Sequence, residues 1–157
     1  MNMIYLSQAL DATLVVLLLI SCVTDWRERI IPHWLNITIA LLAPVGWWVH
    51  GLHLWPDIAM QIGLSIGIFA FFLIFQAIGA MGGGDVKLLG ALALWLHWPV
   101  MFTLIFFMSL FGGVLTLVML IYHNAKKFEH KLEIPYGIAI ALAGLLVICK
   151  HYFNHFS

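Results

Sequence analysis

Charged residues are scarce in this chain of 157 residues: only 9% are Asp, Glu, Lys or Arg, whereas 64% are hydrophobic. A soluble domain typically has roughly 25% charged and about 45–50% apolar residues. With a mean hydropathy of +1.05, the sequence lacks the polar side chains that a water-facing surface needs. The composition therefore excludes an ordinary soluble domain and predicts a protein whose solvent is lipid.

Basic clusters and paired cysteines are also missing. Seven Lys and Arg balance seven Asp and Glu, so there is no basic surface for nucleic acid. The two cysteines, Cys22 and Cys149, both lie in apolar runs and form no CxxC pair, so the sequence suggests neither a zinc knuckle nor a disulfide framework. The eight histidines form no HExxH or similar ligand set. We therefore expect no metal and no cofactor.

What the sequence does contain is a series of long apolar runs. They cover approximately residues 4–23, 34–50, 57–79, 85–98, 100–122 and 134–150. A helix that crosses the hydrocarbon core needs about 20 mostly apolar residues, and Pro32, Pro56, Pro99 and Pro135 lie near the predicted boundaries. The sequence therefore predicts an all-α integral membrane protein, a bundle of six transmembrane helices that forms one domain over residues 1–157.

The placement of Lys and Arg predicts the orientation of this bundle. Arg27, Arg29, Lys87 and the lysines of the stretch 123–133 all fall on connections that share one side of a six-span arrangement. An excess of Lys and Arg marks the cytoplasmic side, and tryptophans gather at both interfaces. The connections on the other side lack Lys and Arg and are flanked by tryptophans, so we expect both termini to face outward.

One aspartate is predicted to lie at membrane depth. About 35 residues separate Lys87 from Tyr122, too many for one span and too few for two full spans with a turn. The fourth run must therefore be extended by the segment 81–87, which contains three consecutive glycines and then Asp85. Glycine allows the backbone to unwind there and a peptide to approach it closely. An ionisable group inside a membrane is a functional candidate by default.

The second candidate acid, Asp25, falls at the end of the first run, on the same side as Asp85. Two carboxylates that share a site favour a shared proton, so that one can activate a water while the other polarises a carbonyl group. Each residue also has a simpler interpretation. Asp25 could pair with Arg29 one turn further on, and Asp85 could cap the helix that follows it.

Three motifs resemble a known family of membrane proteases. Residues 82–85 fit the Gly-x-Gly-Asp pattern of intramembrane aspartyl proteases, and residues 84–89 resemble the version found in type IV prepilin peptidases. Residues 25–36 resemble the first aspartate motif of that family, with His33 where Asn is common. Residues 134–139 resemble the segment that opens its last span. The three motifs occur in the order of the family and are spread over nearly the whole chain.

The resemblance implies a function and a site. It implies that Asp25 and Asp85 form the catalytic pair and that the substrate is a prepilin or pseudopilin, cut between its cytoplasmic leader and its hydrophobic helix. It also implies a bacterial inner-membrane location with the active site facing the cytoplasm. Its remaining motif residues, expected to support the site, are Gly82, Gly84, Lys87, Pro135, Tyr136 and Gly137.

The same resemblance favours a compact form of the enzyme. Larger prepilin peptidases have an additional cytoplasmic, cysteine-containing portion that is linked to N-methylation of the new terminus. Neither such an insertion nor a CxxC pair occurs here, as in the peptidases of tight-adherence (Flp) pili. We therefore expect no separate methyltransferase domain and no N-methyltransferase activity.

Two other functions stay open at this point. A small transporter or channel subunit could use Asp25 and Asp85 to relay protons or cations, and a non-catalytic assembly subunit could use the glycine segment for packing only. Asp11 is not part of the pair, because about 14 helical residues, or roughly 21 Å, separate it from Asp25; a polar contact near the outer leaflet is expected.

Three further features have alternative uses. Lys87 either extends to the cytoplasmic interface or biases the charge of the aspartates, and on a helix it should face away from Asp85. The Gly63-x3-Gly67 and Gly79-x3-Gly83 spacings allow close helix packing, with a homodimer as the alternative. The charged stretch 123–133 could lie on the membrane surface or receive the substrate leader.

Overall fold

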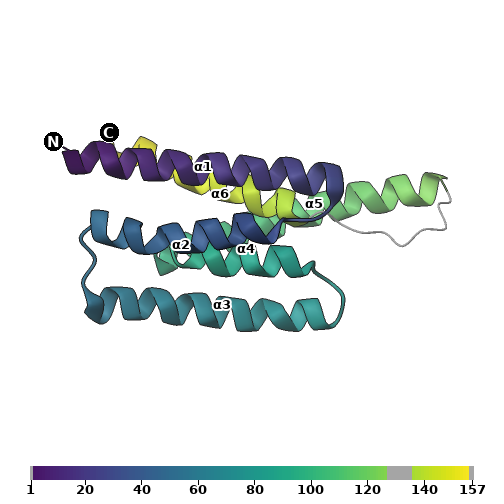
Figure 1. The fold of residues 1–157 in the computed structure, drawn as a ribbon. Helices are drawn as coiled ribbons and strands as arrows, with labels where there is room; N and C mark the ends of the chain where they lie inside the picture. The colour runs from purple at the N-terminus through teal and green to yellow at the C-terminus, as the bar shows by residue number, and fades with distance from the viewer. Residues whose placement is uncertain (1, 127–135, 156–157) are drawn as a thin grey trace.

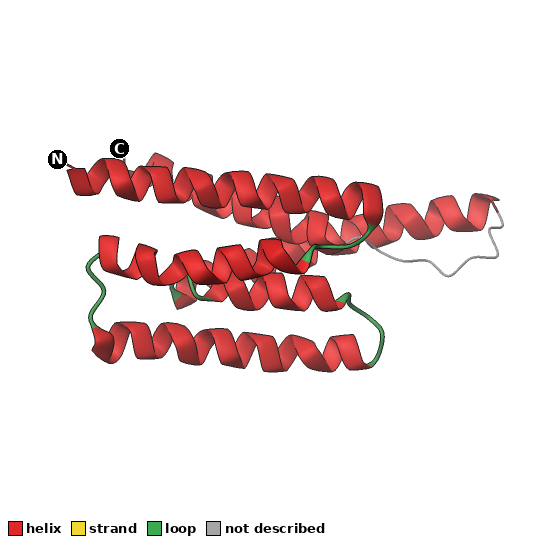
Figure 2. Cartoon of the chain, in the orientation of Figure 1, coloured by secondary structure: helices red, strands yellow, loops and turns green. Residues whose placement is uncertain are grey.

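The computed structural model describes residues 2–126 and 136–155, and all regular structure in these ranges is helical (Figure 1, Figure 2). The helices are α1 (Asn2–Glu28), α2 (His33–Val49), α3 (Ala59–Ala77), α4 (Gly83–Ala93), α5 (Trp98–Lys126) and α6 (Tyr136–His155). A short helical segment, η1 (Leu54–Ile58), precedes α3. The predicted all-α fold and the number of helices are confirmed.

Several of these helices have the length and composition of membrane spans. Met3–Glu28, Leu54–Ala77 and Trp98–Ile121 are long and apolar enough to cross a bilayer, and Tyr136–Lys150 is a shorter apolar helix. Most of their side chains are not buried inside the protein, which fits contact with lipid rather than water. The chain is therefore a multi-pass membrane protein.

Two helices continue beyond the apolar runs that predicted them. α1 continues past position 23 to Glu28, and Arg29, with a φ of 54°, ends it in the left-handed region. α5 continues from position 122 to Lys126, and its last turns project beyond the rest of the bundle (Figure 1). Hydropathy marks the part of a helix that lies in lipid, whereas the backbone stays helical into the polar interface.

The short helix α4 lies at the centre of the bundle. It packs against α3, α2 and α6, whereas α1 packs mainly against α6 and α2, and α5 mainly against α6. Eight of the 11 residues of α4 are buried, from Asp85 and Val86 to Ala93. Around α4, fully buried side chains such as Leu18, Leu35 and Ile140 fill the core.

Connections that bear the predicted motifs gather at one end of the bundle. Both termini lie at the other end, so α1 and α3 run toward the same side, where the connections 29–32 and 78–82 are found (Figure 1). We call this side the aspartate end. Its orientation toward the cytoplasm stays a prediction.

Two tryptophans join α2 to α4. The Trp47 indole N–H donates a hydrogen bond to the Leu94 carbonyl at the end of α4 (2.7 Å). The Trp95 indole N–H donates in turn to the Ile39 carbonyl (2.8 Å). Carbonyl groups at a helix end have no partner within their own helix. These side chains therefore fix the end of α4 as well as lying near an interface.

We expect Trp47→Phe to lower the free energy of unfolding by about 1 kcal/mol or more, because the bond to the Leu94 carbonyl is lost and the phenyl ring is smaller than the indole. Denaturant unfolding of the protein in detergent measures this difference. Trp48→Phe is the matched control, since Trp48 is 67% exposed. Equal effects of the two substitutions would show that the hydrogen bond contributes nothing.

Candidate active site

Asp25 lies near the end of α1 and caps a different helix. Its side chain is only 3% exposed, and its Oδ2 atom accepts a hydrogen bond from the backbone N–H of Ile138 (3.0 Å), 113 positions further along the chain. The backbone N–H of Gly137 also interacts with this carboxyl group. Gly137 and Ile138 are in the first turn of α6, where N–H groups lack partners within the helix. Asp25 therefore joins the end of α1 to the start of α6.

Gly137 makes this contact possible. A β-carbon at position 137 would lie 2.7 Å from Asp25 Oδ2 and 2.8 Å from the Ile31 side chain. Real β-carbons essentially never approach other atoms this closely. The glycine of the third predicted motif is therefore needed at this position to leave room for the aspartate of the first motif.

Asp85 lies in the first turn of α4 and is 6% exposed. Gly82 precedes the helix with an extended backbone (φ −71°, ψ 143°), and its backbone N–H donates to the Asp85 carboxyl group. This contact is the acidic half of a capping box. Asp85 therefore does cap α4, as its simpler interpretation states. The carboxyl group is nevertheless buried, whereas an ordinary cap of a surface helix is in water.

The two carboxyl groups share one region of the protein. α1 and α4 both pack against α2 and α6, and both acids lie at the aspartate end. Ile31 packs against Gly84, the neighbour of Asp85, and also against Gly137, which lies beside the Asp25 carboxyl group. The positive charge of Arg29 also acts on the Asp25 carboxyl group. This agrees with the simpler interpretation, in which Asp25 pairs with Arg29. Asp25 is not a surface residue, however, because its side chain is buried.

Two residues that were not predicted as site residues hold the start of α4. Ile31, in the connection between α1 and α2, packs against Gly84: a β-carbon at position 84 would be 3.1 Å from the Ile31 β-carbon. Asn36, which is 5% exposed, donates from Nδ2 to the Gly84 carbonyl (3.1 Å). Its Oδ1 is buried without a partner among the described residues. A single Asn inside the apolar run 34–50 was the signal that could have identified it.

The other predicted motif residues lie around this pair. Lys87 is exposed and its Nζ lies 3.4 Å from His33 Nδ1, so it faces away from buried Asp85 as predicted. Tyr136 packs against Gly112 of α5, where a β-carbon would be 3.2 Å from its ring. Pro135 and residues 127–133 of the charged stretch lie outside the described residues.

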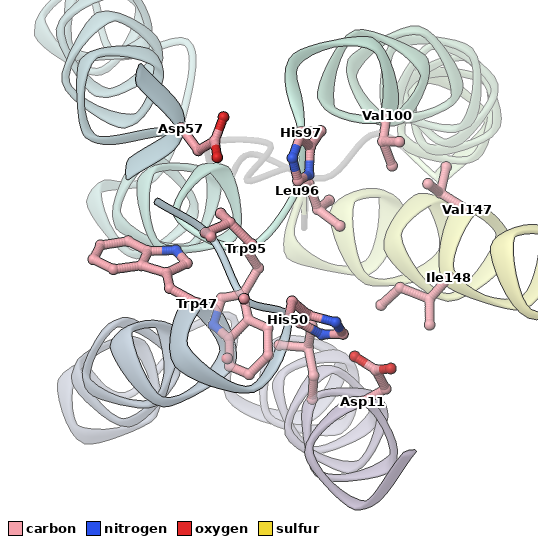
Figure 3. Close-up of a pocket in the computed structure, with 14 residues that line it drawn as sticks. Asp11, Trp47, His50, Asp57, Trp95, Leu96, His97, Val100, Val147 and Ile148 are labelled. Atoms are coloured by element: carbon pink, nitrogen blue, oxygen red, sulfur yellow. The ribbon is translucent and has the colours of Figure 1, made fainter. Parts of the chain in front are cut away.

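Asp11 belongs to a separate cavity at the opposite end of the bundle. This cavity of about 410 Å³ is lined by residues from five helices and includes Trp47 and Trp95. Figure 3 shows the His50 ring and the Asp11 carboxylate pointing toward one another, with Asp57 and His97 across the cavity. The structure thus separates Asp11 from the pair. Within residues 2–126 and 136–155, no group of three or more His, Cys, Asp or Glu could hold a metal ion.

Comparison with known proteins agrees with the motifs. The model of the type IV leader peptidase family matches residues 12–117. A prepilin leader peptidase/N-methyltransferase of Xanthomonas campestris pv. campestris is 30% identical over 129 residues, which are 78% of this chain and 43% of that protein. A protein of the same name from Pseudomonas aeruginosa is 35% identical over 81 residues, 52% of this chain and 27% of that protein.

The chain thus spans less than half the length of either of these relatives. No solved structure matches it. The family match nevertheless covers more than half of the chain and includes both Asp25 and Asp85. The resemblance that the motifs indicated is confirmed: the chain belongs to the type IV leader peptidase family.

Proposed function

We propose that this chain is an intramembrane aspartic endopeptidase that removes the leader from a prepilin or pseudopilin. The observation that carries the proposal is that Asp25 and Asp85, which come from distant parts of the chain, are both buried at the aspartate end, next to residues that pack against the same side chain, Ile31. Burying two acids is costly in a protein of this size. Capping α4 and α6 does not by itself require two buried aspartates.

The proposed chemistry needs only water and the two carboxyl groups. One aspartate, as the carboxylate, takes a proton from water while the water oxygen bonds to the scissile carbonyl carbon. The other aspartate, protonated, donates its proton to the carbonyl oxygen. When the gem-diol intermediate collapses, the C–N bond breaks, the amine leaves with the proton taken from water, and one hydroxyl proton returns to the second aspartate.

Access to the pair supports a peptide substrate. Gly82 is exposed, and its extended backbone lies directly beside the Asp85 carboxyl group, with a site for a β-carbon only 3.0 Å from Oδ2. The absence of a side chain lets another backbone approach at this point. We propose that the substrate peptide lies along this glycine segment, with the aspartate end toward the cytoplasm and both termini on the periplasmic side.

A transporter or channel subunit is the alternative function. It would also use buried acids, but both aspartates lie at one end of the bundle and not at its middle, where coupling ions usually bind. The two functions are separated by co-expressing the chain with a candidate prepilin and sequencing the N-terminus of the product. Cleavage supports the peptidase, whereas a proton flux without cleavage would support the transporter.

The names of the relatives combine leader cleavage with N-methylation. For this chain we propose cleavage alone, and mass spectrometry of the mature pilin tests the proposal directly. An unmethylated N-terminus is expected. A methylated product in a host that lacks any other prepilin methyltransferase would contradict this part of the proposal.

The purified protein should cleave a prepilin peptide at the same rate with and without a chelator, because the proposed mechanism assigns no step to a metal ion. The measurement compares initial rates in EDTA, in excess Mg²⁺ and in excess Zn²⁺. A loss of activity in EDTA that Zn²⁺ or Mg²⁺ restores would contradict the proposed chemistry, because a metal would then be needed to activate the water.

A further inference from the structure

A second cavity begins at the aspartate end of the bundle and is lined by the face of α4 that includes Lys87. This groove of about 630 Å³ runs between α2, α3 and α4. Its lining includes Lys87 and His33 at the aspartate end, and Ile37, Phe69 and Leu94 along its walls. None of the residues proposed for catalysis lines it.

The mouth of the groove is basic. Lys87 and His33 are both exposed, and Lys87 Nζ lies 3.4 Å from His33 Nδ1. Among the described residues, no carboxylate pairs with Lys87. A Lys that is placed at the membrane interface without a neutralising acid attracts anionic lipid headgroups.

The rest of the groove is apolar and runs along the bundle. The lining residues are Lys87, Gly90 and Ala91 on α4, Leu94 directly after it, and His33, Asn36, Ile37 and Ala40 on α2. These positions recur every three or four residues, so each set forms one face of its helix. From Lys87 to Leu94 the groove extends for about 10 Å, enough for the upper part of an acyl chain.

Two side chains of the groove donate hydrogen bonds to the protein itself, although Asn36 Oδ1 has no partner among the described residues. Ser65 Oγ donates to the Gly90 carbonyl (2.7 Å), and Asn36 Nδ2 donates to the Gly84 carbonyl (3.1 Å). Phe69 covers Gly90 so closely that a β-carbon there would be 3.3 Å from its ring. The groove therefore presents a positive charge at one end and mainly hydrocarbon beyond it.

We propose that this groove binds one anionic phospholipid, with its phosphate at Lys87 and His33 and one acyl chain along Ile37, Phe69 and Leu94. The groove matches such a lipid along its length: its basic end would contact the anionic headgroup, and its apolar walls would contact the acyl chain. The surrounding bilayer supplies the ligand. The proposal does not depend on peptidase activity.

Native mass spectrometry of the full chain in detergent tests this site. The probes are phosphatidylglycerol and phosphatidylcholine with identical acyl chains, added in equal amounts. The protein should retain one phosphatidylglycerol in preference to phosphatidylcholine. Lys87→Gln should lower the retained phosphatidylglycerol roughly fivefold, the effect of one interfacial basic residue, whereas Lys87→Arg should keep it.

Two variants serve to separate this site from a general charge effect. Arg27→Gln removes one exposed positive charge at the same end but outside the groove, and it should leave retention unchanged. Ala40→Leu narrows the groove without changing its charge and should weaken retention of the lipid. Circular dichroism of each variant verifies that the helices are intact.

Three results would overturn the proposal. Equal retention of the two lipids would exclude a site for an anionic headgroup. Equal loss in Arg27→Gln and Lys87→Gln would indicate non-specific attraction to the basic end. If Ala40→Leu retains as much phosphatidylglycerol as the unchanged protein and also has a raised KM for a prepilin peptide, then the groove binds the apolar part of the substrate and not a lipid.

Discussion

Asp25→Asn and Asp85→Asn are each expected to abolish prepilin cleavage. The expected fall in kcat is on the order of 10⁴-fold or more, as for residues that act as one catalytic unit. Asn has nearly the shape of Asp and retains an oxygen that can accept the Ile138 or Gly82 N–H. The substitution therefore removes the exchangeable proton and the charge while keeping most of the capping contact. Co-expression with prepilin, followed by a gel-mobility assay, measures the loss.

The matched controls for these variants are Asp11→Asn and Asp57→Asn, which change acids that line the cavity at the opposite end. Both controls should process prepilin at close to the normal rate. Each variant should also be present in the membrane fraction at normal abundance. If either Asp25→Asn or Asp85→Asn still cleaves prepilin, the two residues are not a catalytic pair.

Gly137→Ala is expected to have the second largest effect. The added β-carbon would lie 2.7 Å from Asp25 Oδ2, so the carboxyl group must turn away or α6 must move. A displacement of about 1 Å near the reacting groups can cost roughly 10²-fold in rate. Overpacking of a buried position also costs about 1–3 kcal/mol of stability. Initial cleavage rates and denaturant unfolding together measure both effects.

Gly113→Ala provides the control, because no atom lies within 4 Å of a β-carbon added at that position. It should leave activity unchanged and, within α5, should stabilise the helix by up to about 1 kcal/mol. If Gly137→Ala is as active and as stable as Gly113→Ala, then the close approach of Asp25 to α6 is not important for the site.

Much of the fold could be predicted because membrane helices are marked by their composition. The six runs predicted the six helices, and the shortage of residues between Lys87 and Tyr122 predicted that Asp85 lies at membrane depth, in a cavity and not in a loop; the depth stays a prediction. In the structure Asp85 is buried in the first turn of α4. These predictions needed only lengths and hydropathy, which are local properties of the sequence.

The contacts that organise the site could not be predicted in the same way. The bond from Ile138 to Asp25 joins residues 113 positions apart, and no pattern near either residue marks it. The space left by Gly137 and the anchoring of Gly84 by Asn36 likewise depend on how α1, α2, α4 and α6 pack together. Trp47 and Trp95 were expected only as interfacial residues, because their indole partners are set by tertiary packing.

Chemical cross-linking of position 25 to position 85 tests the central claim most directly. Asp25→Cys and Asp85→Cys are combined in a chain in which Cys22 and Cys149 are replaced by Ser, and a short bifunctional thiol reagent is added in the membrane. Mass spectrometry should detect a linked pair of peptides from α1 and α4, and none when Cys at position 25 is paired with Cys at position 57 at the opposite end. A link between positions 25 and 57, with no link between positions 25 and 85, would contradict the proposal that Asp25 and Asp85 share one site.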